Sequence, residues 1–235
     1  MHRRFLILLP LVLLAAGPAT AQEEAWTACR RAIAAAEPGS GIPPGLLLAI
    51  ALVETGRSDP RTGRYEPWPW SWNVEGEPGL APSRQAAVAQ VRALLGAGRR
   101  SIDIGCMQVN LLHHPDAFSG PEEGFDPATN VRYAIRFLKS LHARSGSWGQ
   151  AIADYHSADE LRGATYQRKV VLARLGAAWA SGGGAVPLRA AAGLCAAGRQ
   201  PVLVMRRGAQ RPRLACQPAR RVRPAPNPGS APAPG

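Results

Sequence analysis

The chain has 235 residues and a formal net charge of +12, but its basic residues are unevenly distributed. Residues 22–185 hold 17 lysines and arginines against 16 acidic residues, whereas residues 186–235 hold nine arginines and no acidic residue. The excess charge is therefore a property of the C-terminal region alone, and it excludes a uniformly basic protein body.

Residues 1–21 have the pattern of a secretory signal peptide. Two arginines precede an apolar stretch from Phe5 to Ala16, which the small residues Ala19-Thr20-Ala21 follow. That stretch is shorter than the roughly 20 residues that a membrane-spanning helix needs, and no later segment is apolar enough to span. We predict cleavage after Ala21 and export to the periplasm or beyond, so nucleic acid is not an expected partner. The alternative is a retained membrane anchor.

Four cysteines follow the signal sequence. An even number of cysteines in an exported chain indicates disulfides, and four cysteines allow three pairings. We favour Cys29–Cys106 and Cys195–Cys216, because each pair then lies within one compositional region.

The mature sequence predicts a mostly helical domain over residues 22–180, which is long enough for a single core. Residues 57–82 are rich in Pro, Gly and Trp, and we expect them to be irregular or to contain short strands. Helical periodicity and capping residues predict helices over residues 25–36, 44–55, 83–95, from Asp126-Pro127 onward, 148–155 and 165–180.

The sequence after residue 180 changes in composition. Residues 181–185 read as a glycine-rich linker, and residues 186–219 as a small basic region. Within that region, residues 202–205 and 213–216 are suited to a hairpin that the second disulfide would close. Residues 220–235 alternate Pro with small residues and are expected to be disordered.

A carboxylate at the end of the most apolar mature segment is the first candidate for chemistry. Leu46 to Val53 are all apolar and lead directly to Glu54, and Gly56 stands where a left-handed C-cap glycine is expected. Burial and the negative end of the helix both disfavour the ionised carboxylate, while Arg57 is expected to point to solvent. Glu54 is therefore a candidate general acid. The alternative is a glutamate that only caps its helix toward water.

Two further segments carry polar groups suited to sugars. Gly105 to Asn110 combines a glycine, a thioether and two amides, and amides recognise sugar hydroxyl and acetamido groups. Tyr155, next to His156, ends a predicted helix. Its hydroxyl either lies near a carboxyl group or belongs to an ordinary half-buried core tyrosine.

Four motifs together resemble those of the soluble lytic transglycosylase (SLT) family. Glu54-Thr55 resembles its Glu-Ser motif, and Gly105-Cys-Met-Gln108 resembles its Gly-Leu-Met-Gln motif. Asn130 to Leu138 is similar to its Asn-Leu-x-x-Gly-x-x-Tyr-Leu helix, and Asp154 to Ala158 to its Ala-Tyr-Asn-Ala-Gly motif. The motifs occur in the family's order and span roughly residues 40–175.

The resemblance implies a mainly α, lysozyme-like fold and peptidoglycan glycan strands as the substrate. It implies cleavage of the β-1,4 bond between MurNAc and GlcNAc with formation of 1,6-anhydro-MurNAc ends, with Glu54 as the only acid/base and no cofactor. His156 stands where the family has asparagine, so the role of that side chain is open. The same carry-over predicts substrate-binding residues at Thr55, Met107, Gln108, Asn110, Tyr155 and His156.

The sequence is also compatible with other functions. Asp103 is a possible second carboxylate, which would make the protein a hydrolytic lysozyme-type muramidase. A non-catalytic peptidoglycan-binding module is a further hypothesis. A third is an accessory of a secretion or conjugation apparatus, docked through the basic tail to an anionic wall polymer or an acidic partner. The tail is equally compatible with a solvated segment that binds nothing.

Two other features have competing interpretations. Trp68, Trp70 and Trp72 alternate, and they either form a sugar-stacking platform or close the core over a long insertion; we favour the core. The His113-His114 pair invites a metal interpretation, but no third ligand has fitting spacing, so we expect no metal.

Overall fold

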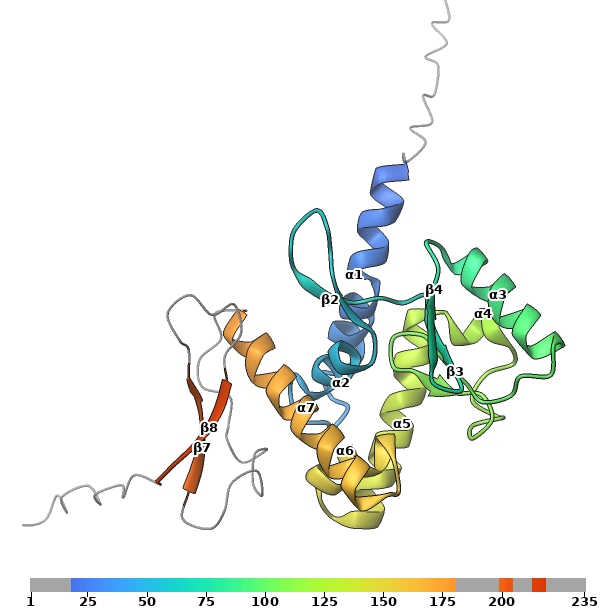
Figure 1. Ribbon diagram of the computed structural model, residues 1–235. Coiled ribbons are helices and arrows are strands. Elements are labelled where there is room, and N and C mark those ends of the chain that lie inside the picture. Colours follow the sequence, from blue (N-terminus) through green and yellow to red (C-terminus); the bar gives the residue numbers. More distant parts are fainter. Residues whose placement is uncertain (1–17, 181–198, 205–212, 219–235) are drawn as a thin grey trace, which may run out of the picture. The chain divides into compact units, whose positions relative to one another are not determined.

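The computed structural model describes residues 18–180, 199–204 and 213–218 (Figure 1). The mainly helical fold predicted from the sequence is confirmed. Most of the predicted signal sequence, the linker at 181–185, Cys195 and the proline-rich tail lie outside the described residues. The chain divides into two compact units, residues 1–140 and 141–235.

The first unit begins with two packed helices and a small hairpin. These are α1 (Pro18–Ala36), α2 (Leu46–Thr55), β1 (Gly56–Ser58) and β2 (Tyr65–Pro67). Strand β2 pairs antiparallel with β1 and contacts both helices. Figure 1 shows β2 beside α1 and α2. Helix α2 therefore leads directly into a strand with no intervening loop.

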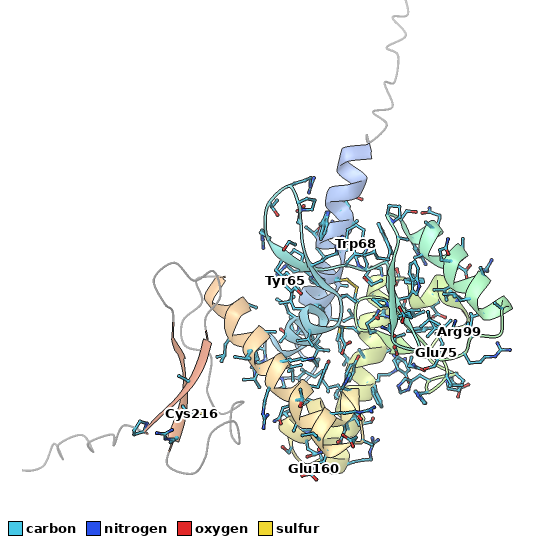
Figure 2. All side chains as sticks on the ribbon, viewed as in Figure 1. Tyr65, Trp68, Glu75, Arg99, Glu160 and Cys216 are labelled. Atoms are coloured by element: carbon cyan, nitrogen blue, oxygen red, sulfur yellow. A yellow bond between two sulfur atoms is a disulfide. The ribbon has the colours of Figure 1, made fainter. Side chains whose placement is uncertain are left out.

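A four-stranded antiparallel sheet forms the other part of this unit, in the order β4-β3-β5-β6. Its inner side packs against α3 around Val91, Ile102, Ile104 and Phe125, which are fully buried. Glu75, in the β3–β4 turn, pairs with Arg99 at 2.6 Å (Figure 2). The elements are β3 (Ser71–Val74), β4 (Glu77–Leu80), α3 (Arg84–Gly96), β5 (Ile102–Ile104), β6 (Val109–Asn110) and α4 (Pro121–Gly124).

The sequence-predicted helices are present, with shifts at some of their ends. Ser83 caps α3 by accepting the N–H of Ala86, and Asp126 accepts the N–H of Thr129 at the start of α5 (Pro127–Ser145). Helix α2 begins at Leu46 rather than residue 44, because Gly45 takes a left-handed conformation that a helix cannot include.

The second unit contains a helical hairpin and a β-hairpin. Helix α6 (Trp148–His156) packs against α7 (Glu160–Ala180), which begins five residues earlier than predicted because Asp159 caps its first turn. Strands β7 (Arg199–Val204) and β8 (Arg213–Pro218) pair antiparallel, as predicted from residues 202–216. None of the helices in the described part of the chain combines the length and the apolar character that a membrane crossing needs.

Candidate active site

Glu54 lies in the last turn of α2, the most apolar helix of the described chain, and its side chain is half-buried. The helix buries most of its length because nearly all of its residues are aliphatic, and its partly exposed positions are Leu48, Val53 and Glu54. The aligned peptide dipoles of α2 give its C-terminal end, and therefore the surroundings of Glu54, a partial negative charge. Buried residues of the helix are Leu46, Leu47, Ala49, Ile50, Ala51, Leu52 and Thr55.

The expectation of a left-handed Gly56 is wrong. Gly56 has φ −63° and ψ 131°, an extended conformation, because it is also the first residue of β1. Glycine is required here by close approach: a Cβ would lie 2.2 Å from the carbonyl oxygen of Leu52 and 2.3 Å from the ring of Tyr65. Tyr65 itself is half exposed beside this helix end (Figure 2).

Thr55 connects the helix end to the segment that carries the second motif. Its side chain is buried, and its hydroxyl lies 3.2 Å from the carbonyl oxygens of both Ala51 and Cys106. A single hydroxyl hydrogen can be donated to one of these at a time. Thr55 therefore positions the Gly105–Gln108 turn against the helix that carries Glu54.

The Gly105–Gln108 turn joins β5 to β6 and is fixed by Asn130. The buried Asn130 amide accepts the N–H of Met107 at 2.9 Å and donates to the carbonyls of Ile104 at 3.0 Å and Gly124 at 2.9 Å. Gly105 has φ +79°, and a Cβ there would lie 2.4 Å from the Asn130 amide nitrogen. The first residue of the turn must therefore be glycine for both reasons.

The side chains of Met107 and Gln108 differ in position. Met107 is fully buried, whereas Gln108 is half-buried and adopts φ +46°, unusual for a residue with a side chain. The Gln108 amide nitrogen lies 3.1 Å from the Ser71 carbonyl oxygen and 3.0 Å from that of Gly105. These hydrogen bonds hold the turn against β3, so the thioether of Met107 packs inside while Gln108 stays near the surface.

Asn110 and Asp103 face each other across the paired strands β5 and β6. The Asn110 amide nitrogen donates to the Asp103 carboxylate at 2.8 Å, and its oxygen accepts the N–H groups of Leu112 and His113. Both polar ends of Asn110 therefore bond within the protein. The Asn110 side chain therefore stabilises the turn that follows β6.

The tryptophans at 68, 70 and 72 do not form a continuous exposed platform. Trp68, labelled in Figure 2, is 3% exposed. Its ring packs at a tilt against that of Trp26, and its ring N–H donates to the Ala81 carbonyl at 2.9 Å. Trp70 and Trp72 pack partly against the core of the sheet. The expectation that Arg57 points to solvent is wrong. Its guanidinium lies over the rings of Trp26 and Trp68, at 5.6 and 5.7 Å from their centroids.

A disulfide links the first helix to the turn of the second motif. Cys29 of α1 and Cys106 are bonded to each other, as expected from the sequence, at a sequence separation of 77. Cys106 therefore occupies its place in the motif as a structural residue and not as a thiol. Cys216 is also disulfide-bonded, and its expected partner, Cys195, lies outside the described residues.

Tyr155 and His156 end helix α6 in the second unit. Tyr155 is half-buried and His156 is exposed, with its ring stacked on Tyr166 at a centroid distance of 4.5 Å. The expected proximity of Tyr155 to Glu54 stays a prediction.

His114 belongs to an aromatic cluster. Its Nδ1 lies 2.8 Å from the Tyr133 hydroxyl, and its ring packs against Tyr133 and Phe137. Burial lowers the pKa of His114, and the neighbouring His113 lowers it further. Among the residues that the structure describes, no group of three or more His, Cys, Asp and Glu side chains is arranged to hold a metal ion.

The structure thus brings Thr55 at the end of α2 into contact with the Gly105–Gln108 turn through protein hydrogen bonds. Sequence reasoning missed the residue that fixes the turn, Asn130, although it opens one of the four motifs. Its signal was an amide at the first turn of a helix, next to the apolar stripe that begins with Val131.

The chain was compared with models of known protein families. The family model for the transglycosylase SLT domain matches residues 31–168, more than half of the chain. The chain belongs to the SLT family. The matched segment includes Glu54, the Gly105–Gln108 turn, Asn130 and Tyr155. No curated protein and no solved structure matched the chain. Membership of the SLT family suggests lytic transglycosylase activity on peptidoglycan.

Proposed function

We propose that this protein is an exported lytic transglycosylase that cleaves the MurNAc–GlcNAc β-1,4 bond of peptidoglycan and leaves 1,6-anhydro-MurNAc ends. The observation that carries the proposal is the position of Glu54 within the SLT match: a half-buried carboxyl group at the end of a buried apolar helix. Such surroundings favour a carboxyl group that can donate a proton.

In the proposed reaction one carboxyl group serves both steps. Glu54 first protonates the glycosidic oxygen as its bond to C1 of MurNAc breaks. The resulting carboxylate then takes the proton of the C6 hydroxyl as that oxygen bonds to C1, which closes the anhydro ring and restores the acid. No water is consumed, and no second carboxylate is required, in contrast to the usual glycosidase pair.

The other predicted site residues divide into two groups. Gln108, Tyr155 and His156 are partly or fully exposed and remain our candidates for contact with the glycan. Thr55, Met107 and Asn110 are buried or fully engaged in protein hydrogen bonds, and we assign them to holding the Gly105–Gln108 turn in place. A clamped turn lowers the entropy that substrate binding must overcome.

A hydrolytic muramidase with Asp103 as second carboxylate is the main alternative. The hydrogen bond from Asn110 to Asp103 favours a positioning role for this carboxylate over activation of a water molecule. A non-catalytic glycan-binding module is the other alternative, and a retained acid at position 54 speaks against it. Product analysis separates all three hypotheses.

The experiment is a muropeptide analysis of purified peptidoglycan digested by the wild-type protein. Mass spectrometry should find anhydro-MurNAc ends, which are lighter by one water than reducing ends. Reducing ends alone that disappear in an Asp103→Asn variant would establish the hydrolase instead. Binding to peptidoglycan without any released product would leave the binding module.

We further propose that residues 1–21 direct export and that the mature protein acts in the periplasm. The Cys29–Cys106 disulfide supports an oxidising compartment. Mass analysis of the exported protein should place its first residue at Gln22. The basic tail is proposed to dock on an anionic wall polymer or an acidic partner, and deletion of residues 186–235 should then change localisation.

A further inference from the structure

We propose that a shallow basic pocket on the α6–α7 hairpin binds a carboxylate of a peptidoglycan peptide stem. The inference rests on the proposed function, because that function supplies peptidoglycan as the substrate. The pocket lies entirely within the second unit. It is lined by His156, Leu161, Arg162, Thr165, Tyr166 and Lys169.

One wall of the pocket is a pair of stacked rings. The ring of His156 lies parallel to that of Tyr166, with 7° between the planes and 4.5 Å between the centroids. Tyr166 is buried, whereas His156 is exposed. The buried tyrosine therefore fixes the orientation of the histidine and gives the pocket a flat aromatic surface.

The charge of the pocket is cationic. Arg162 and Lys169 are both exposed and stand two helical turns apart on α7, so they share one face of the helix. The ion pairs formed among the described residues include neither of them, and no carboxylate lines the pocket. Asp159, just before α7, caps the helix by accepting the backbone N–H of Arg162 at 2.8 Å.

Close packing of the two helices holds the pocket in shape. At Gly163 a Cβ would lie only 3.1 Å from the Cβ of Ala153 and 3.2 Å from the carbonyl oxygen of Ser157. The start of α7 therefore presses directly on the end of α6. This close contact holds together the backbone segments that carry Arg162 and His156.

The side chains that line the pocket suit a ligand that has a carboxylate next to a small apolar group. Arginine and lysine bind a carboxylate through charge-assisted hydrogen bonds, and Thr165 adds a hydroxyl. Leu161, which is 76% exposed, offers an apolar surface beside the two cations. An alanine residue with a free carboxylate presents a methyl group next to its negative charge, and peptide stems contain such residues. A bare phosphate ion has no group for the apolar surface.

The test compares two substrates and two variants of the full chain. Arg162→Gln/Lys169→Gln removes both charges, and Arg168→Gln removes an exposed charge of the same helix that does not line the pocket. Cleavage is measured on peptidoglycan with intact stems and on glycan strands whose stems an amidase has removed. The double variant should lower the ratio of kcat/KM for stem-bearing over stripped strands roughly fivefold, as loss of two exposed charge contacts predicts. Arg168→Gln should leave that ratio as it is.

A binding measurement makes the result independent of catalysis. Isothermal titration with the soluble stem tetrapeptide, its fully amidated form and inorganic phosphate should detect binding of the free-acid peptide only, and the double variant should weaken it. Equal losses on stripped strands, or binding of phosphate in preference to the peptide, would overturn the pocket. If the wild type cleaves neither substrate but binds the peptide through the two cations, the proposed reaction fails and the pocket stands.

Discussion

Replacement of Asn130 by alanine tests how the second motif is held beside Glu54. The substitution leaves the N–H of Met107 and the carbonyls of Ile104 and Gly124 without their partner, in a site where Asn130 is fully buried. Each unsatisfied buried group costs about 1–3 kcal/mol, so the three together should lower the free energy of unfolding by about 3–9 kcal/mol. That loss is a large part of the total stability of an ordinary domain.

Urea unfolding followed by tryptophan fluorescence measures this loss directly. Lys139→Ala is the matched control, because it truncates an exposed side chain of the same helix, and it should shift the free energy by less than about 0.5 kcal/mol. Asn130→Asp retains the shape but replaces both N–H donors by an acceptor, so it should be nearly as damaging. An Asn130→Ala protein within about 1 kcal/mol of the wild type would refute the assignment of Asn130 as the residue that fixes the turn.

Three further substitutions test Gly56, the Cys29–Cys106 disulfide and His114. Gly56→Ala forces a Cβ against the Leu52 carbonyl oxygen and should lower the free energy of unfolding in urea by about 1–3 kcal/mol. The control Gly96→Ala, with open space around it, should not destabilise the protein. Equal urea midpoints for the two variants would contradict the close approach at Gly56. A Cys29→Ser/Cys106→Ser variant opens a loop of 77 positions and should lose roughly 4 kcal/mol, by the chain-entropy account; an unchanged melting temperature would argue against a stabilising bridge. Burial lowers the pKa of His114 below its ordinary 6.5. As the pH falls, the unfolded chain therefore protonates this histidine before the folded protein does. The contribution of neutral His114 to stability should be fully present above pH 6.5 and should be lost progressively below it. His114→Asn should remove that part of the acid sensitivity in melting curves recorded from pH 7.5 to 5, and identical pH slopes would count against it.

The helices were predictable because their signals are local. Ser83 and Asp126 stand at helix starts that need a side-chain acceptor, and both accept a backbone N–H there. The apolar run before Glu54 likewise identified a buried helix whose final turn holds a carboxylate. Local pattern could not give the conformation of Gly56, because that depends on the strand pairing of Gly56 with Pro67 and on the ring of Tyr65.

Residues that act across long sequence separations were harder to assign. Asn130 looked like one helical residue of a motif, yet its amide bonds to groups 23 and 26 positions away. Its position just after Gly56 predicts that Arg57 points to solvent, whereas its guanidinium lies over the ring of Trp26 in α1, which is remote in sequence. The disulfide was predictable only as a preference among three pairings, and its presence follows from α1 lying beside the turn of the second motif.

Glu54→Gln tests whether Glu54 is the only acid/base of the proposed reaction. This change keeps the size of the side chain and removes its titratable proton, and Glu24→Gln is the control on an exposed glutamate of the same unit. We expect Glu54→Gln to lower the release of anhydro-muropeptides from purified peptidoglycan by about 10²–10⁴-fold, with the urea midpoint retained. Release at the wild-type rate by a folded Glu54→Gln protein would contradict it.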